Sequence, residues 1–151
     1  MQINKLGKIL KFILIVGGIL YIPAFIYCPF LLHNSKSIVH SMIMIYPNGI
    51  LMLGVIYEFI RLFKKIEDNN PFTISTVNIL KQTGIITFIM SIIWLLDLIF
   101  MVTIMKNTYI NYILVLLFLC ILFFGVSIAL YMLSVLIRQA TEYKEENDLT
   151  I

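Results

Sequence analysis

One acidic residue stands inside a long apolar stretch of the chain: Asp97, within residues 93–98, IWLLDL. A carboxylate deep in a bilayer costs at least about 3 kcal/mol unless it is neutral or has a partner. Asp97 is therefore either a proton- or cation-coupled site or a structural group. Apolar surroundings favour the protonated, neutral carboxyl in either case.

The structural interpretation of Asp97 has two forms. In the first, its carboxyl hydrogen-bonds a tyrosine hydroxyl on a neighbouring helix, with Tyr21, Tyr27 and Tyr112 as the candidates. In the second, the side chain reaches outward toward Lys106 or water. The residue types favour a structural role over a coupling role.

The remaining sequence lacks the residue groupings that catalysis or metal binding needs. It contains no HExxH motif, no glycine-rich phosphate loop and no nucleophile placed beside a base. His33 and His40 are seven residues apart in a short connection, which makes a weak metal site. Cys28 and Cys120 stand alone in apolar segments, which is typical of packing. We therefore expect no enzyme activity, no cofactor and no metal.

The composition indicates that these residues are positioned by membrane helices. Of the 151 residues, 61% are hydrophobic and 13% are charged, with a mean hydropathy of +1.01. Soluble domains carry about a quarter charged residues, so a water-soluble globule is excluded. Intrinsic disorder is excluded too, because it requires low hydrophobicity.

Four segments have the roughly 20 apolar residues that a bilayer core of about 30 Å requires. They are residues 9–32, 42–63, 83–105 and 110–137. Lipid requires each span to satisfy its own backbone hydrogen bonds, so all four are expected to be helices. The predicted fold is a single all-α domain, a four-transmembrane-helix bundle. A cytoplasmic loop at 64–82 and a cytoplasmic acidic tail at 138–151 complete it.

The basic residues predict the orientation. One side of the predicted bundle holds nine of them: Lys5, Lys8, Lys11, Arg61, Lys64, Lys65, Lys81, Arg138 and Lys144. The other side holds only Lys36 and Lys106. Basic loops stay cytoplasmic, so both termini are expected in the cytoplasm. No basic aromatic surface lies outside the spans, so direct nucleic-acid binding is not expected.

Prolines mark two of the predicted helices. Pro23 and Pro29 each remove a backbone hydrogen bond, so a bend is expected between residues 19 and 25 of the first span. Pro47 is expected either inside the second helix or in its first turn, where a proline loses nothing. Near the end of that helix, Glu58 and Arg61 are expected to form a local ion pair.

The loop before the third span is expected to form an amphipathic cytoplasmic segment. Pro71 forces an extended residue before it, and Thr73 is a suitable N-cap for a helix from residue 74. Phe72 is expected to pack on Val77 as a hydrophobic staple. This helix is predicted to lie at the headgroup boundary and to turn into the third span near Gly84. Its role is either anchoring or a platform for a cytoplasmic partner.

The tail is acidic on an otherwise basic side of the membrane. An ion pair between Arg138 and Glu142 is expected on a helical extension of the last span. Beyond it, the tail is either a frayed, solvated end or a docking peptide. The candidate docking residues are Pro71, Phe72 and Thr73 in the loop and Glu145, Glu146, Asn147, Asp148, Leu149 and Ile151 in the tail.

The sequence NPFT at 70–73 and the terminal EENDLTI at 145–151 resemble the YoaS-like family of small bacterial membrane proteins, a family of unknown function. The resemblance implies four helices in the bacterial inner membrane and no catalytic residues. It also implies a small helix-turn-helix transcription regulator as partner, since genes of this family often neighbour one. Relatives usually have a glycine-containing turn where this chain has Asn69 and Asn70 before Pro71.

The predicted function is that of a membrane-embedded regulatory or interaction protein that acts on a cytoplasmic partner. Two alternatives stay open: a small transporter or channel that uses Asp97, and an immunity-type protein against membrane-active peptides. Besides the lipid bilayer, the expected partners are the cytoplasmic protein and, for a transporter above all, a second copy of the chain.

Overall fold

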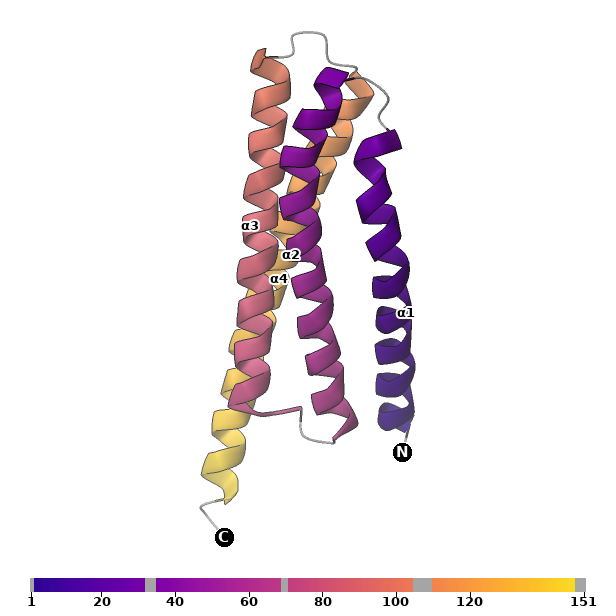
Figure 1. The fold of residues 1–151 in the computed structure, drawn as a ribbon. Coiled ribbons are helices and arrows are strands. Elements are labelled where there is room, and N and C mark those ends of the chain that lie inside the picture. The colour runs from indigo at the N-terminus through magenta and orange to yellow at the C-terminus, as the bar shows by residue number, and fades with distance from the viewer. Residues whose placement is uncertain (1, 32–34, 69–70, 105–109, 149–151) are drawn as a thin grey trace.

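The computed structural model contains four long helices and describes residues 2–31, 35–68, 71–104 and 110–148. The helices are α1 (Gln2–Leu31), α2 (Ser35–Glu67), α3 (Ile74–Ile104) and α4 (Ile110–Asp148). α1 and α3 run in one direction and α2 and α4 in the other, so both termini lie at the same end of the molecule (Figure 1). The predicted all-α class is confirmed.

The helices pack in chain order. α1 packs on α2, α2 on α3 and α3 on α4, with the most extensive packing between α3 and α4. In the described ranges, the α1 backbone does not come close to that of α3 or α4. α1 is therefore held along one side only, and it stands at the edge of the bundle (Figure 1).

The outer surface is apolar, and this identifies the solvent as lipid. Three helical segments are long and apolar enough to cross a membrane: Gly7–Tyr27, Ile74–Thr103 and Ile113–Asn147. Large hydrophobic side chains cover their outward faces, whereas the buried apolar core is small and consists of Val55, Val77, Ile79, Leu80, Met90, Leu116 and Leu130. In water such a surface would be unstable. The chain is a multi-pass membrane protein, in line with the prediction.

The second predicted span differs most from expectation. Within the described residues, α2 contains no segment that is both long and apolar enough to count as a candidate membrane span. It carries Asn48, Glu58 and Arg61 along its length, and these polar groups lower its hydropathy. The helix begins at Ser35, so the expected polar connection at 33–41 is largely helical. Pro47 lies inside α2 and not in its first turn.

The expected turn at Gly84 is wrong, because α3 is one continuous helix from Ile74 to Ile104. Its start agrees with the prediction: the Thr76 backbone N–H donates to Thr73 Oγ1 at 3.3 Å, which makes Thr73 the N-cap. Phe72 is 48% exposed while Val77 is buried. The expected hydrophobic staple between Phe72 and Val77 therefore does not bury the Phe72 side chain, about half of which stays exposed.

The predicted tail is helical over most of its length. α4 continues without a break to Asp148, and its last turns extend beyond the ends of the other helices (Figure 1). A proline-free and glycine-free sequence after Gly125 explains this continuity, because nothing there interrupts the backbone hydrogen bonds. Residues 149–151 of the predicted tail lie outside the described residues.

Candidate functional site

Polar side chains follow the buried face of α3 over most of its length. They are Thr76, Thr83, Thr87, Ser91 and Asp97, at spacings that keep them on one side of a helix. Thr83 Oγ1 donates to the Ile79 carbonyl at 2.8 Å, and Thr87 Oγ1 lies 3.0 Å from the carbonyl oxygen of Thr83. The helix itself therefore satisfies these two hydroxyls, which is how threonine is usually accommodated in a membrane helix.

Asp97 is 1% exposed, which argues against the alternative of an outward reach to water, whereas Lys106 lies outside the described residues. Of the tyrosines expected as partners, Tyr27 is exposed, and Tyr21 lines a cavity between the helices. The side chain of Tyr112 lies outside the described residues. Burial of this degree suits a structural hydrogen bond and a proton-coupled site equally.

All four helices contribute to a cavity of about 400 Å³. α1 supplies Tyr21 and Phe25 and α4 supplies Leu119 and Phe123, while α2 and α3 close the inner side. Cavities that bind small molecules usually have volumes of about 300–1,000 Å³ and apolar walls with a few polar groups. Asp97 does not line this cavity, although it lies about one helical turn after Trp94, which does.

An aromatic cluster forms the α1 side of this cavity. Phe25 stacks on Tyr21 with ring centroids 5.7 Å apart, and it meets Tyr46 of α2 edge-on at 5.3 Å. The Phe25 ring lies where a β-carbon on Gly49 would stand. Only glycine at position 49 therefore lets the ring rest directly on the backbone of α2.

Two polar groups interrupt the apolar lining of the cavity. The Asn48 side chain of α2 is buried, and so is the indole nitrogen of Trp94, the single tryptophan of the chain. Trp94 Nε1 has no hydrogen-bond acceptor among the described residues. Neither residue was predicted as a site, although a polar side chain inside a span is itself a signal.

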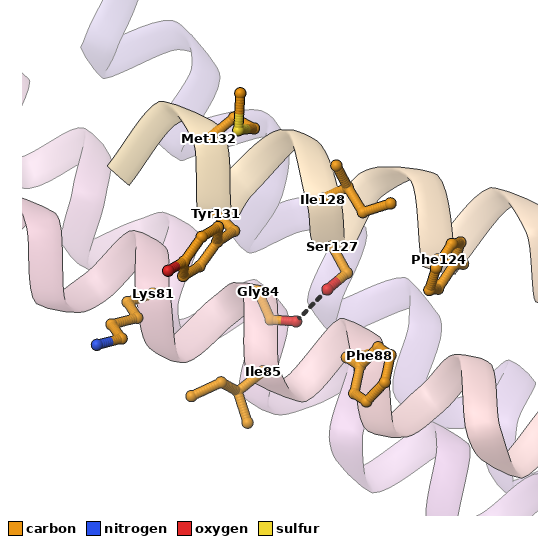
Figure 2. Close-up of a pocket in the computed structure, with 9 residues that line it drawn as sticks. All are labelled: Lys81, Gly84, Ile85, Phe88, Phe124, Ser127, Ile128, Tyr131 and Met132. Carbon is orange, nitrogen blue, oxygen red and sulfur yellow. Dashed lines mark hydrogen bonds between the residues drawn. The ribbon is translucent and has the colours of Figure 1, made fainter. Parts of the chain in front are cut away.

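Small residues hold α3 and α4 together. Ser127 Oγ of α4 donates to the Gly84 carbonyl of α3 at 2.8 Å (Figure 2). Cys120, Ser127, Ser134 and Thr141 recur every seven residues on α4, and the last three are buried. Small residues at an interface let membrane helices approach closely. The packing of α4 on α3 was not predicted, although this seven-residue repeat is visible in the sequence.

A second, smaller hollow of about 310 Å³ lies beside this contact (Figure 2). Phe88 and Phe124 form one end of it, with ring centroids 6.2 Å apart, and Lys81 lies at the other end. Both phenylalanines are among the exposed side chains. The hollow therefore belongs to the outer, lipid-facing surface and is not an enclosed site.

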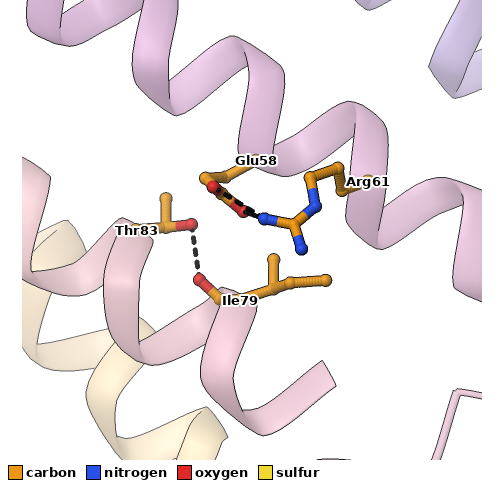
Figure 3. A network of polar contacts seen from close by, with 4 residues as sticks. All are labelled: Glu58, Arg61, Ile79 and Thr83. Atoms are coloured by element: carbon orange, nitrogen blue, oxygen red, sulfur yellow. Dashed lines mark hydrogen bonds and ion pairs between the residues drawn. The ribbon is translucent and has the colours of Figure 1, made fainter. Parts of the chain in front are cut away.

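The expected ion pair on α2 is confirmed. Arg61 Nη1 lies 3.0 Å from both carboxylate oxygens of Glu58, and the guanidinium stands 5.8 Å from the centre of the Tyr57 ring. Glu58 faces α3 beside Thr83 and is buried (Figure 3). Arg61 therefore neutralises a carboxylate that would otherwise stand alone at a helix interface.

The predicted docking residues lie at the end of the bundle that carries both termini. Pro71, Phe72 and Thr73 precede α3, and Glu145, Glu146, Asn147 and Asp148 form the last turn of α4. Figure 1 shows the start of α3 and the end of α4 at this same end. Leu149 and Ile151 lie outside the described residues.

In the part of the chain that the structure describes, no three His, Cys, Asp or Glu side chains gather as a group that could hold a metal ion. The side chains of His33, His40 and Cys28 are not among those described. Cys120 is a free thiol, and its sulfur lies 3.8 Å from Ser91 Oγ. Its role within the described residues is to pack at the interface between α3 and α4.

A family model described as "Protein of unknown function (DUF2975)" matches residues 13–151. The chain belongs to this family. The resemblance to a family of unknown function is thereby confirmed in its broad form, whereas the YoaS-like name is not. The comparisons with curated proteins and with solved structures give no match.

Proposed function

We propose that this DUF2975 protein spans the bacterial inner membrane four times and holds a basic cytoplasmic partner at the membrane through the end of α4. The observation that carries the proposal is the length of α4, which continues as a helix beyond the rest of the bundle (Figure 1). Thr141 is the last buried residue of α4 among those described, and positions 142–147, which follow it, are exposed and carry three glutamates.

The direction of the helices supports a fourth span. α1 and α3 both run from the end that carries the termini to the opposite end (Figure 1). If both cross the membrane, the chain between them has to return across it, and α2 is that segment. Its 33 residues give a length of about 50 Å at 1.5 Å per residue, more than the core of a bilayer requires.

The charges at the terminal end support a cytoplasmic location for both termini. Lys11 Nζ of α1 lies 3.3 Å from Glu67 of α2, and Lys8 Nζ lies 3.9 Å from the same carboxylate. Lys64 and Lys65 stand in the last turn of α2 at this end. A concentration of lysine and arginine at one end is typical of the cytoplasmic side of a membrane protein.

The register of α4 gives the proposed docking surface a definite face. Glu145 follows Thr141 by four residues and Asp148 follows it by seven, so both positions continue the α4 face that packs on α3. α3 begins only at Ile74, and Glu145 is exposed. Phe72, exposed just before α3, adds an apolar side chain at the same end of the molecule. An acidic face with an exposed aromatic ring at the same end suits a basic protein surface.

A small DNA-binding regulator would present such a basic surface, because lysine and arginine side chains neutralise DNA phosphates. The acidic face of α4 would compete with DNA for those side chains and so keep the regulator at the membrane. This partner class, implied by the family resemblance, is part of the proposal.

Neutralising the acidic face is expected to weaken partner binding. With Glu145→Gln and Asp148→Asn combined, we expect retention of the partner to fall about fivefold at physiological salt, since each such charge contributes a few tenths to 1 kcal/mol. The measurement is co-purification of the crosslinked partner with tagged full-length chain. Asp68→Asn, an exposed acid at the same end of α2, is the matched control. Equal retention by all three proteins would exclude this surface.

The transport alternative depends on Asp97. Asp97→Asn keeps the size and the hydrogen-bonding capacity of the side chain but removes the ability to carry a proton. Under the proposed function, we expect this variant to insert and to bind the partner at the wild-type level. Ion flux in proteoliposomes separates the two functions: a wild-type flux that Asp97→Asn abolishes, with insertion unchanged, would favour a transporter.

A further inference from the structure

The Trp94 indole nitrogen is a buried hydrogen-bond donor inside the four-helix cavity, and it has no acceptor among the described residues. A buried donor without a partner costs about 1–3 kcal/mol. Bulk water, which would satisfy it in a soluble protein, is absent from the hydrocarbon region of a bilayer. The position therefore favours an acceptor that arrives from the membrane itself.

The walls of the cavity define what such a molecule looks like. Phe25, Met52, Met90 and Phe123 line the cavity together with Trp94 and give it apolar and aromatic walls. The methionine side chains are flexible and polarisable, so they adapt to an apolar body of irregular shape. An apolar molecule with one oxygen acceptor would fill this space and satisfy Trp94 at the same time.

The cavity also has a side through which a membrane molecule can enter. Ala24 lines it and is exposed on α1, and α1 is held by α2 alone within the described ranges. Separation of α1 from α4 at this level needs no break in a close backbone contact. A molecule that enters between α1 and α4 would reach Trp94 from the lipid without passing through water.

We propose that this cavity binds a membrane-soluble carbonyl compound whose oxygen accepts a hydrogen bond from Trp94 Nε1. The shared chemistry is a carbonyl on a long alkyl or isoprenoid body, and its source is either the acyl ester of a lipid or a free quinone. This inference is independent of the proposed docking surface, and it assigns a small-molecule site that the docking surface does not require.

The single tryptophan makes the site directly observable. Delipidated full-length protein in dodecyl maltoside, a detergent without a carbonyl group, is titrated with monoolein in one arm and with decylubiquinone in the other. The readout is the resonance Raman band of the indole ring that reports hydrogen bonding at Nε1. We expect a saturable change. A change with monoolein alone identifies an acyl ester, and a change with decylubiquinone alone identifies a quinone.

A variant that fills the cavity completes the test. Ala24→Phe adds a ring at an exposed position that lines the cavity, and it leaves the Trp94 reporter in place. We expect at least a tenfold higher probe concentration at half-saturation. Ala129→Phe, at an exposed position of α4 outside the cavity, is the control and should bind as the wild type does. No Raman change with either probe, or equal binding by Ala24→Phe, would overturn the proposal.

Discussion

Replacing Gly84 with leucine is expected to destabilise the bundle by about 2–3 kcal/mol, the usual cost of forcing extra atoms into a packed interface. A β-carbon at this position would stand 3.4 Å from the Ser127 carbonyl oxygen and 3.7 Å from Leu130 Cβ. Alanine nearly fits there, but a leucine side chain has to push α4 away from α3. The hydrogen bond from Ser127 Oγ to the Gly84 carbonyl would be lost with the contact.

The measurement is the free energy of unfolding in mixed micelles, obtained by titration with sodium dodecyl sulfate. Gly125→Leu is the matched control, because it makes the same substitution on α4 at a position with no neighbouring atom within 4 Å. We expect that variant to unfold within about 0.5 kcal/mol of the wild type. If both variants lost the same stability, the loss would not come from packing at Gly84.

The second large effect is expected from Arg61→Ala. This change leaves the Glu58 carboxylate buried at the interface between α2 and α3 without its cation. Removing one partner of a buried ion pair costs about 3–5 kcal/mol. Because the Arg61 side chain is 44% exposed and that of Glu58 only 11%, we expect a smaller loss of about 2–3 kcal/mol in the same titration.

Two further variants test the reason for that loss. Arg61→Ala combined with Glu58→Gln removes the uncompensated charge, so it should recover more than half of the lost stability. Arg138→Ala breaks the exposed pair with Glu142, whose side chains are 66% and 51% exposed, and should leave the free energy of unfolding close to that of the wild type. A loss at Arg61 no larger than that at Arg138 would show that Glu58 is hydrated and not buried.

Features that depend on local sequence were predicted well. Composition and apolar length are enough to indicate membrane helices, and the cap at Thr73 and the pair between Glu58 and Arg61 involve residues three positions apart. The helix ends were predicted less well. Ser35 and Asp148 lie beyond the predicted spans, because hydropathy marks where a helix leaves the lipid and not where its hydrogen bonds stop.

Features that depend on how helices meet were not predicted. Trp94, Asn48 and Phe25 come from three different helices, and their gathering around one cavity follows from the packing order. Gly84 finds its partner Ser127 on another helix, and spacing along one helix does not reveal such a pair. Asp97 was recognised because its charge is unusual inside a span, and its burial agrees with that recognition.

The central claim is that the chain crosses the membrane four times and that the end of α4 lies in the cytoplasm. The proposed docking surface can meet a cytoplasmic partner only there. Cysteine labelling with a membrane-impermeant maleimide tests this in intact bacterial cells. Glu145→Cys and Ile110→Cys are each made in a chain whose native Cys28 and Cys120 are replaced by alanine. We expect labelling at position 110 in intact cells, and at position 145 only after permeabilisation. Labelling at position 145 in intact cells would place the end of α4 outside and contradict the account.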